Sequence, residues 1–208
     1  MKLLYLLPTL VLFAALPNRE AGLRPVQYGF REQLAVGKVL VADEKLADPN
    51  FAQSVVLILQ YDSDNGTLGL IVNRRADTPL SKLFPDLKGV KTDPVYLGGP
   101  VDIGTAQALL RLPAQVDLAS HVFGDVYATG SKELIEKSVA SGAASSRFRV
   151  YAGYAGWAPG QIEAEIDIGA WSVREISPAQ VFDGDPDSLW SRLTRASHSQ
   201  IARNTRTQ

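Results

Sequence analysis

The chain has 208 residues, 46% of them hydrophobic and 21% charged, a balance typical of a globular protein rather than a disordered one. It contains no cysteine, which excludes disulfides, thiolate metal sites and cysteine nucleophiles. The formal net charge is −1; the N-terminal segment carries +2 and the tail from Arg195 carries +3, which leaves −6 on the domain between them. Such a domain is a poor candidate for direct nucleic-acid binding, because Lys and Arg contacts to phosphates supply most of that affinity.

The N-terminus resembles an export signal. Lys2 is followed by an apolar run from Leu3 to Leu16, which is shorter than the ~20 residues of a membrane span and fits the hydrophobic part of a secretory signal. We therefore expect residues 1–22 to be a signal-peptide-like or anchor segment of an exported protein, periplasmic or secreted, followed by a linker over residues 23–35. A buried helix is the alternative, which Pro8 disfavours. The membrane would be reached only through this segment, if it stays uncleaved.

Residues 36–195 read as one domain that opens with strands. Val36–Ala42 favours a first strand, and the uniformly apolar run Ser54–Tyr61 predicts a central one. Asn65-Gly66 predicts a hairpin turn into a partner strand over Thr67–Asn73. We then expect a short helix from Pro79, with Thr78 as its N-cap.

The second half alternates strands and helices. Further strands are expected at Val95–Leu97, Ala106–Leu112, Val126–Ala128, Phe148–Tyr154 and Trp171–Arg174. Helices are expected at Ser131–Ser141, Pro159–Ile168 and Asp187–Thr194, before a polar tail over residues 196–208. The order lacks a regular βαβ rhythm, which favours an α+β fold.

The sequence contains no recognisable catalytic or cofactor motif. His121 and His198 are its two histidines, and we interpret His121, in a loop-like stretch, as a structural or surface residue. Asp183, Asp185 and Asp187 alternate as the first ligands of a calcium loop do, but Ser188 and Thr194 stand where that loop needs Gly and Glu. Asp187 is better explained as the N-cap of the last helix. No metal or cofactor is predicted.

The densest segment is Tyr151–Glu165, YAGYAGWAPGQIEAE. Its glycines let the backbone turn tightly and approach a neighbour closely, and its aromatic residues are amphipathic. One interpretation is a crossing where aromatic rings pack on glycines. The other is a pocket lined by Tyr154 and Trp157, with Gln161 and Glu163 as polar anchors.

Four blocks in the same order resemble the AlgH/YqgE family: ADPNFAQSVVLI, GTLGLIVNR, YLGGPV and GYAGWAPGQIEAEI, spanning Ala47 to Ile166. The resemblance implies an α+β fold with a mixed or antiparallel bifurcated sheet that forms a pseudo-barrel with flanking helices. It implies no established activity, because the family's label of transcriptional regulator rests on a genetic phenotype. Most members are read as cytosolic, so a cytoplasmic location is the alternative to export.

The resemblance also selects candidate residues. The candidate binding cleft comprises Asn73, Arg74, Gly98, Gly99, Gly153, Tyr154, Trp157, Gln161 and Glu163. Asp48, Pro49, Asn50, Pro159 and Gly160 are interpreted as structural motif positions, and Pro100 and Gly156 match the motifs as well.

Two functional hypotheses remain. The favoured one is a non-enzymatic binding or regulatory protein that takes an unknown protein or small-molecule ligand in this cleft, without direct DNA binding. The alternative is a hydrolase or isomerase that uses carboxylates alone, for example Glu163 with Asp48, since a pair of carboxylates can act as acid and base.

Overall fold

The computed structural model describes residues 34–85 and 93–204. The predicted export segment, and all but the last two residues of the linker, lie outside the described residues. The strands are β1 (Val39–Ala42), β2 (Val55–Asp62), β3 (Gly66–Ile71), β4 (Arg75–Pro79), β5 (Pro94–Leu97), β6 (Val101–Arg111), β7 (Ser120–Phe123), β8 (Val126–Thr129), β9 (Phe148–Trp157) and β10 (Trp171–Arg174). The helices are α1 (Leu80–Leu83), α2 (Lys132–Ala140), α3 (Gln161–Asp167), α4 (Pro178–Phe182), the 3-10 turn η1 (Pro186–Ser188) and α5 (Leu189–Asn204).

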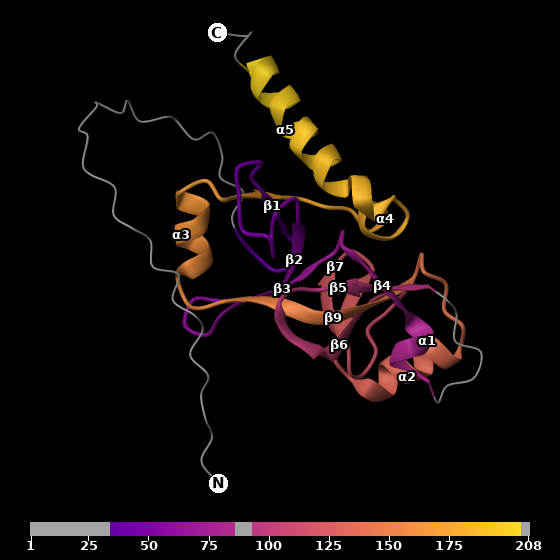
Figure 1. The fold of residues 1–208 in the computed structure, drawn as a ribbon. Coiled ribbons are helices and arrows are strands. Elements are labelled where there is room, and N and C mark those ends of the chain that lie inside the picture. Colours follow the sequence, from indigo (N-terminus) through magenta and orange to yellow (C-terminus); the bar gives the residue numbers. More distant parts are fainter. Residues whose placement is uncertain (1–33, 86–92, 205–208) are drawn as a thin grey trace. The chain divides into compact units, whose positions relative to one another are not determined.

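The strands form one mixed sheet that forks at β9 (Figure 1). The main path runs β10-β1-β2-β3-β9-β6-β8-β7, and the side branch β4-β5 joins β9 through a parallel pair, Tyr96↔Tyr151. The other pairs are antiparallel. The predicted α+β fold with a bifurcated sheet is confirmed. Within the described residues no pairing joins β10 to β7, so the sheet is not closed into a barrel.

The segments with the strongest sequence signals form the predicted elements. β2 is buried on both faces over its first four residues and lies between β1 and β3. The hairpin to β3 ends at Gly66, whose φ of 89° is the left-handed conformation that glycine adopts readily. Ser131 caps α2 by accepting a hydrogen bond from the Leu134 N–H, and Gly142 follows the helix with φ 67°.

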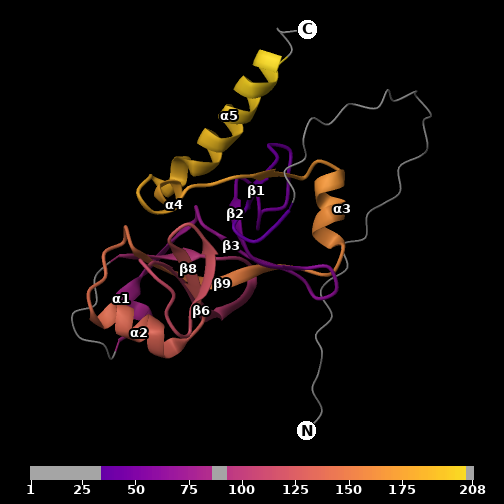
Figure 2. The ribbon, with the colours of Figure 1, turned by 180° about the vertical axis from the view of Figure 1, so that it is seen from behind.

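Both faces of the sheet are covered. On one face, β1, β2, β6 and β9 contribute to an apolar cluster that is closed by Val181 and Phe182 of α4 and by Leu189 and Leu193 of α5. On the other, α3 packs with Ile162 against the strands around β2. Beside it, α1 and α2 cover β6 and β9 with Leu80, Ile135 and Val139. Seen from behind, α1 and α2 again lie side by side (Figure 2).

Three short elements differ from the sequence prediction. β4 is a polar, proline-ended strand that exists through its pairing with β5, and it makes Pro79, not Thr78, the N-cap of α1. β7 includes His121, so that residue lies in a strand and not in a loop. α4 is five residues long and is held by a capping box of Ser177 and Gln180.

The C-terminus is more helical than predicted. α5 continues to Asn204, into the segment that we expected to be a polar tail. Asp185 caps η1 with its side chain, so Asp187 lies inside that turn and is not the N-cap. Among the residues that the structure describes, no helix is both long and apolar enough to cross a membrane.

A glycine pair provides a stability test. A Cβ on Gly98 would lie 2.3 Å from the Gly153 carbonyl oxygen, whereas one on Gly104 would meet nothing within 4 Å. We expect Gly98→Ala to lower the free energy of unfolding by about 2 kcal/mol or more, because overpacking forces the backbones apart. Gly104→Ala, the matched control, should change it little. Urea unfolding measures both, and equal effects would contradict this packing.

Candidate functional site

An open hollow of about 340 Å³ lies where the β2–β3 hairpin meets the end of β9. Its floor runs across three strands, because Gln60 pairs with Leu68 and Leu68 pairs with Gly156. Val101 of β6, which pairs with Tyr154, lies at its side. The lining residues are Gln60, Asn65, Gly66, Thr67, Leu68, Val101, Tyr154, Gly156 and Trp157.

Gly156 leaves the space open. Its φ lies outside the left-handed region, and a Cβ there would meet the Tyr154 ring at 3.4 Å and Val101 at 4.0 Å, so an L side chain fits the backbone. Gly66 in the same hollow differs, because its φ is 89° and its Cβ would lie 2.2 Å from the Trp157 carbonyl oxygen. Backbone geometry therefore requires a glycine at position 66 but not at position 156. What Gly156 provides is room over the sheet.

The hollow is uncharged. Among the residues that the structure describes, no Asp, Glu, Lys, Arg or His lines it. Its polar groups are the amides of Gln60 and Asn65 and the hydroxyls of Thr67 and Tyr154, set beside the apolar side chains of Leu68 and Val101. A few hydrogen-bonding groups in a partly aromatic wall suit a neutral ligand group with a flat apolar part.

The predicted cleft residues do not come together in one cleft. Only Tyr154 and Trp157 of the nine line this hollow. The indole of Trp157 is 5% exposed and stacks on Phe51 at 5.7 Å between ring centroids, so Trp157 is mainly a core residue.

Gly98, Gly99 and Gly153 form a backbone crossing. Gly98 joins two strands, because its carbonyl accepts from the Ile71 N–H and its N–H donates to the Ala152 carbonyl. A Cβ on Gly99 would lie 2.2 Å from the Tyr154 backbone, and one on Gly153 would lie 2.7 Å from the Gly99 carbonyl oxygen. These three glycines allow chains to touch, and all three are buried.

Asn73 and Arg74 clamp a loop. The Asn73 side chain accepts from the Val55 N–H at 2.8 Å and donates to the Gln53 carbonyl at 3.0 Å. Arg74 donates to the carbonyls of Asn50 and Ala52 at 2.7 and 3.1 Å. Within the clamped loop, which includes Pro49, the Asp48 carboxylate accepts from the Asn50 N–H at 2.8 Å. Their hydrogen bonds hold the backbone before β2.

Helix α3 is anchored by a carboxylate that the sequence did not single out. Glu165 accepts from the indole N–H groups of Trp157 and Trp171, at 3.1 and 2.8 Å, and from the Gln161 amide at 2.9 Å. Pro159 and Gly160 precede the helix, and Gly160 is its N-cap with φ 74°. The spacing of Glu165 four residues after Gln161 permits that amide contact in a helix, but only the fold brings Trp171 to it.

Glu163 has a different partner. It accepts a hydrogen bond of 2.8 Å from the Tyr61 hydroxyl, and its other oxygen is buried without a partner in the described structure. That hydrogen bond, with smaller effects of burial and of the Glu163 charge, raises the pKa of Tyr61 above its ordinary value. Glu163 and Asp48 thus engage separate groups, Tyr61 and the Asn50 N–H.

The remaining candidates for chemistry are engaged elsewhere. The Nε2 of His121 lies 3.0 Å from the Gly124 carbonyl oxygen, and its ring meets the edge of Tyr127. Asp183, Asp185 and Asp187 form ion pairs with arginines. Across the described ranges, no three His, Asp or Glu side chains are grouped to hold a metal ion.

Comparison with known proteins places the chain in a family. A sequence profile described as AlgH-like matches residues 39–202. The chain belongs to the AlgH-like family. A UPF0301 protein of Streptomyces avermitilis is 36% identical over 177 residues, covering 80% of this chain and 88% of that protein. One from Chlorobaculum tepidum is 32% identical over 166 residues, covering 79% and 88%.

Two solved structures are similar to this AlgH-like domain. A crystal structure of a Corynebacterium diphtheriae protein has a TM-score of 0.67 at 26% identity and covers 81% of this chain and 90% of that one. The solution structure of the AlgH protein of Pseudomonas aeruginosa has a TM-score of 0.62 at 28% identity, covering 78% and 86%. The resemblance inferred from the four sequence blocks is confirmed.

Glu165 should matter more for stability than Glu163. Glu165→Ala leaves two buried indole N–H groups without acceptors, and we expect it to lower the free energy of unfolding by about 3 kcal/mol. Glu163→Ala, the control on the same helix, loses one exposed contact to Tyr61 and should cost less than about 1 kcal/mol. Denaturant unfolding followed by tryptophan fluorescence gives both values. The reverse order would show that Glu165 does not anchor the helix.

Proposed function

We propose that this AlgH-like protein is a non-enzymatic binding protein, and that the hollow over Gly156 receives an uncharged group of a small molecule or a partner protein. The observation that carries the proposal is Gly156 itself. It occupies a strand position that accepts a side chain without strain, and its lack of one opens a space beside the Tyr154 ring.

The chemistry around the hollow supports binding rather than bond-making. Glu165, which holds the lining residue Trp157, accepts hydrogen bonds from Trp157, Trp171 and Gln161. Asp48 is engaged in its own loop, and Glu163 with Tyr61. These contacts therefore give no specific support to the alternative function, an enzyme that uses carboxylates alone.

The ligand class follows from the lining. A flat ring can lie against Tyr154 and Leu68, and a carbonyl or amide can reach Gln60 and Asn65, whose amides both donate and accept. Benzamide combines these two features without a charge and is a suitable probe. Its affinity for an open hollow of this size should be in the millimolar range, as for other small fragments.

Filling the hollow should abolish probe binding. We expect benzamide to shift the NMR signals of Gln60, Leu68 and Tyr154 in the wild-type protein, and Gly156→Leu to weaken that binding at least tenfold, because its side chain occupies the space. Gly104→Leu is the matched control, since Gly104 is an exposed strand glycine like Gly156 but lies in β6, where a Cβ would have no neighbour within 4 Å. Thermal unfolding verifies that both variants fold.

Equal shifts in the wild type and in Gly156→Leu would refute the site. Native mass spectrometry of the full-length protein from its own cells provides a second readout. A retained small molecule that is present in the wild type and lost in Gly156→Leu would identify the natural ligand.

We also propose that residues 1–22 direct export, on the basis of the apolar run Leu3–Leu16 behind Lys2. The mature chain is then expected to begin near Ala15 or Gly22 and to be found outside the cytoplasm. Mass spectrometry of the purified protein, with cell fractionation, tests this. A full-length chain beginning at Met1 in the cytoplasm would contradict it.

A further inference from the structure

A second hollow, of about 270 Å³, lies at the opposite end of β9 from Gly156. It is lined by Arg111, Asp125, Ser146, Arg147 and Asp183. Two arginines and a serine hydroxyl supply hydrogen-bond donors, and the volume suits a small group rather than a drug-sized molecule. It shares no residue with the uncharged hollow, so what it binds is a separate question.

The sheet gathers arginines here. Arg147 is the exposed turn residue that precedes β9, and Arg149 is the buried second residue of that strand. The backbone N–H of Arg111, at the end of β6, donates to the Arg147 carbonyl at 2.9 Å, so Arg111 lies beside Arg147. Arg75 of the β4-β5 branch pairs with Tyr96, which pairs with Tyr151 of β9.

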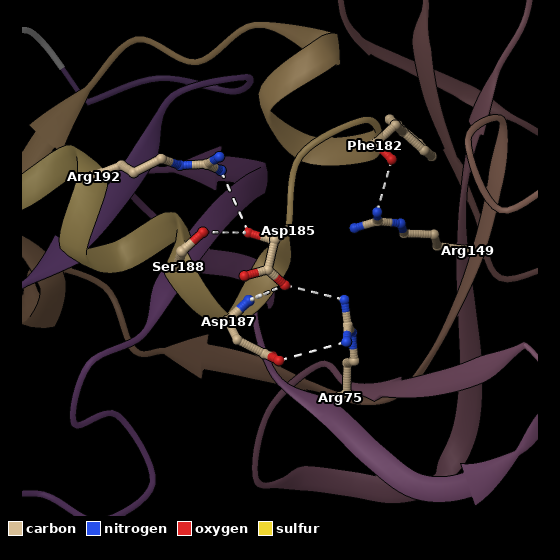
Figure 3. A network of polar contacts seen from close by, with 7 residues as sticks. All are labelled: Arg75, Arg149, Phe182, Asp185, Asp187, Ser188 and Arg192. Carbon is tan, nitrogen blue, oxygen red and sulfur yellow. Dashed lines mark hydrogen bonds and ion pairs between the residues drawn. The ribbon is translucent and has the colours of Figure 1, made fainter.

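The loop Asp183–Asp187 covers these arginines with carboxylates. Asp183 contacts the Arg111 guanidinium at 3.3 Å. Asp185 and Asp187 contact Arg75 at 3.2 and 3.5 Å (Figure 3). All three carboxylates are about half exposed or more, and ion pairs at such positions contribute little to stability.

Arg149 is not neutralised in the same way. It is 6% exposed, and its Nη2 donates to the Phe182 carbonyl at 2.8 Å, as Figure 3 shows. Its guanidinium lies over the rings of Tyr96 and Phe182, while Nε and Nη1 have no partner in the described structure. A buried cation without a carboxylate partner adds positive potential to its surroundings.

The Asp183–Asp187 loop cannot move away from the arginines as a whole, because the residues on either side of it are buried. Phe182 before it is 3% exposed, and Leu189 after it is 1% exposed. The Asp183 side chain, 47% exposed at the rim of the hollow, can nevertheless rotate away without unfolding its neighbours. Asp125 also holds Arg111, because its carboxylate accepts from Nε at 2.9 Å. The longer contact of Arg111 with Asp183, 3.3 Å from Nη1, is therefore the one that an incoming anion would replace.

We propose that the hollow between Arg111 and Arg147 binds a phosphate group, and that Asp183 occupies Arg111 until the ligand arrives. Arginine is the side chain best suited to phosphate, because its planar guanidinium offers several donors with a permanent charge. The Ser146 hydroxyl adds a neutral donor, and the buried charge of Arg149, two residues after Arg147, adds positive potential nearby. A dianionic phosphate competes with the single charge of Asp183 better than a carboxylate does.

Removing the competing carboxylate should strengthen phosphate binding. We expect Asp183→Asn to bind inorganic phosphate about fivefold more tightly than the wild type, in full-length protein at constant ionic strength. Asp117→Asn removes the same charge from an exposed position outside the hollow and should leave the affinity unchanged. Calorimetric titration measures all three proteins.

Arg147 carries the complementary test. It is exposed, so Arg147→Met should leave the fold intact, and we expect it to weaken phosphate binding at least tenfold in the Asp183→Asn background. Glycerol phosphate, titrated in parallel, distinguishes a site for the free ion from one for a phosphate group on a larger molecule. If Asp183→Asn binds no more tightly than Asp117→Asn, or if Arg147→Met has no effect, the proposal is wrong.

Discussion

The contact on which the structure depends is the glycine crossing of Gly98, Gly99 and Gly153. There β3 and the β5–β6 connection meet β9 so closely that any Cβ would collide with backbone. Along β9, Phe148 and Val150 belong to the cluster under α1 and α2, Tyr151 to the one under α4 and α5, and Trp157 to the one under α3. One strand therefore serves three clusters, and the two hollows lie at its two ends.

Most polar side chains of the family motifs hold the backbone in place. Asn73 and Arg74 fix the loop before β2, and Glu165 ties two tryptophans to α3. A motif rich in polar and aromatic residues thus resembles a reactive site in sequence while acting as a scaffold. The proposed binding site lies in what the scaffold leaves open, which is the space over Gly156.

The net charge of the domain does not reveal the arginines at the second hollow. A domain of −6 suggests that anions are repelled, yet the fold collects Arg75, Arg111, Arg147 and Arg149 around one end of the sheet. The Asp183–Asp187 loop pairs with Arg75 and Arg111, so these contacts are seen only once the fold places the loop beside the sheet. The three aspartates alternate in sequence as the ligands of a calcium loop do, but in the structure each forms an ion pair with an arginine.

The sequence by itself determined the family, the α+β class, the buried strand β2, the Asn65-Gly66 hairpin and the capped helix α2, because each rests on local periodicity, turn chemistry or a motif. It did not reveal β4, β7 or α4, which are four or five residues long and depend on tertiary pairing or packing. It named Glu163 where Glu165 is the anchor, since the second tryptophan arrives from β10, outside the motif. Which residues form a hollow was decided by the fold alone, because strand register brings together side chains such as Gln60, Val101 and Gly156 that no sequence pattern links.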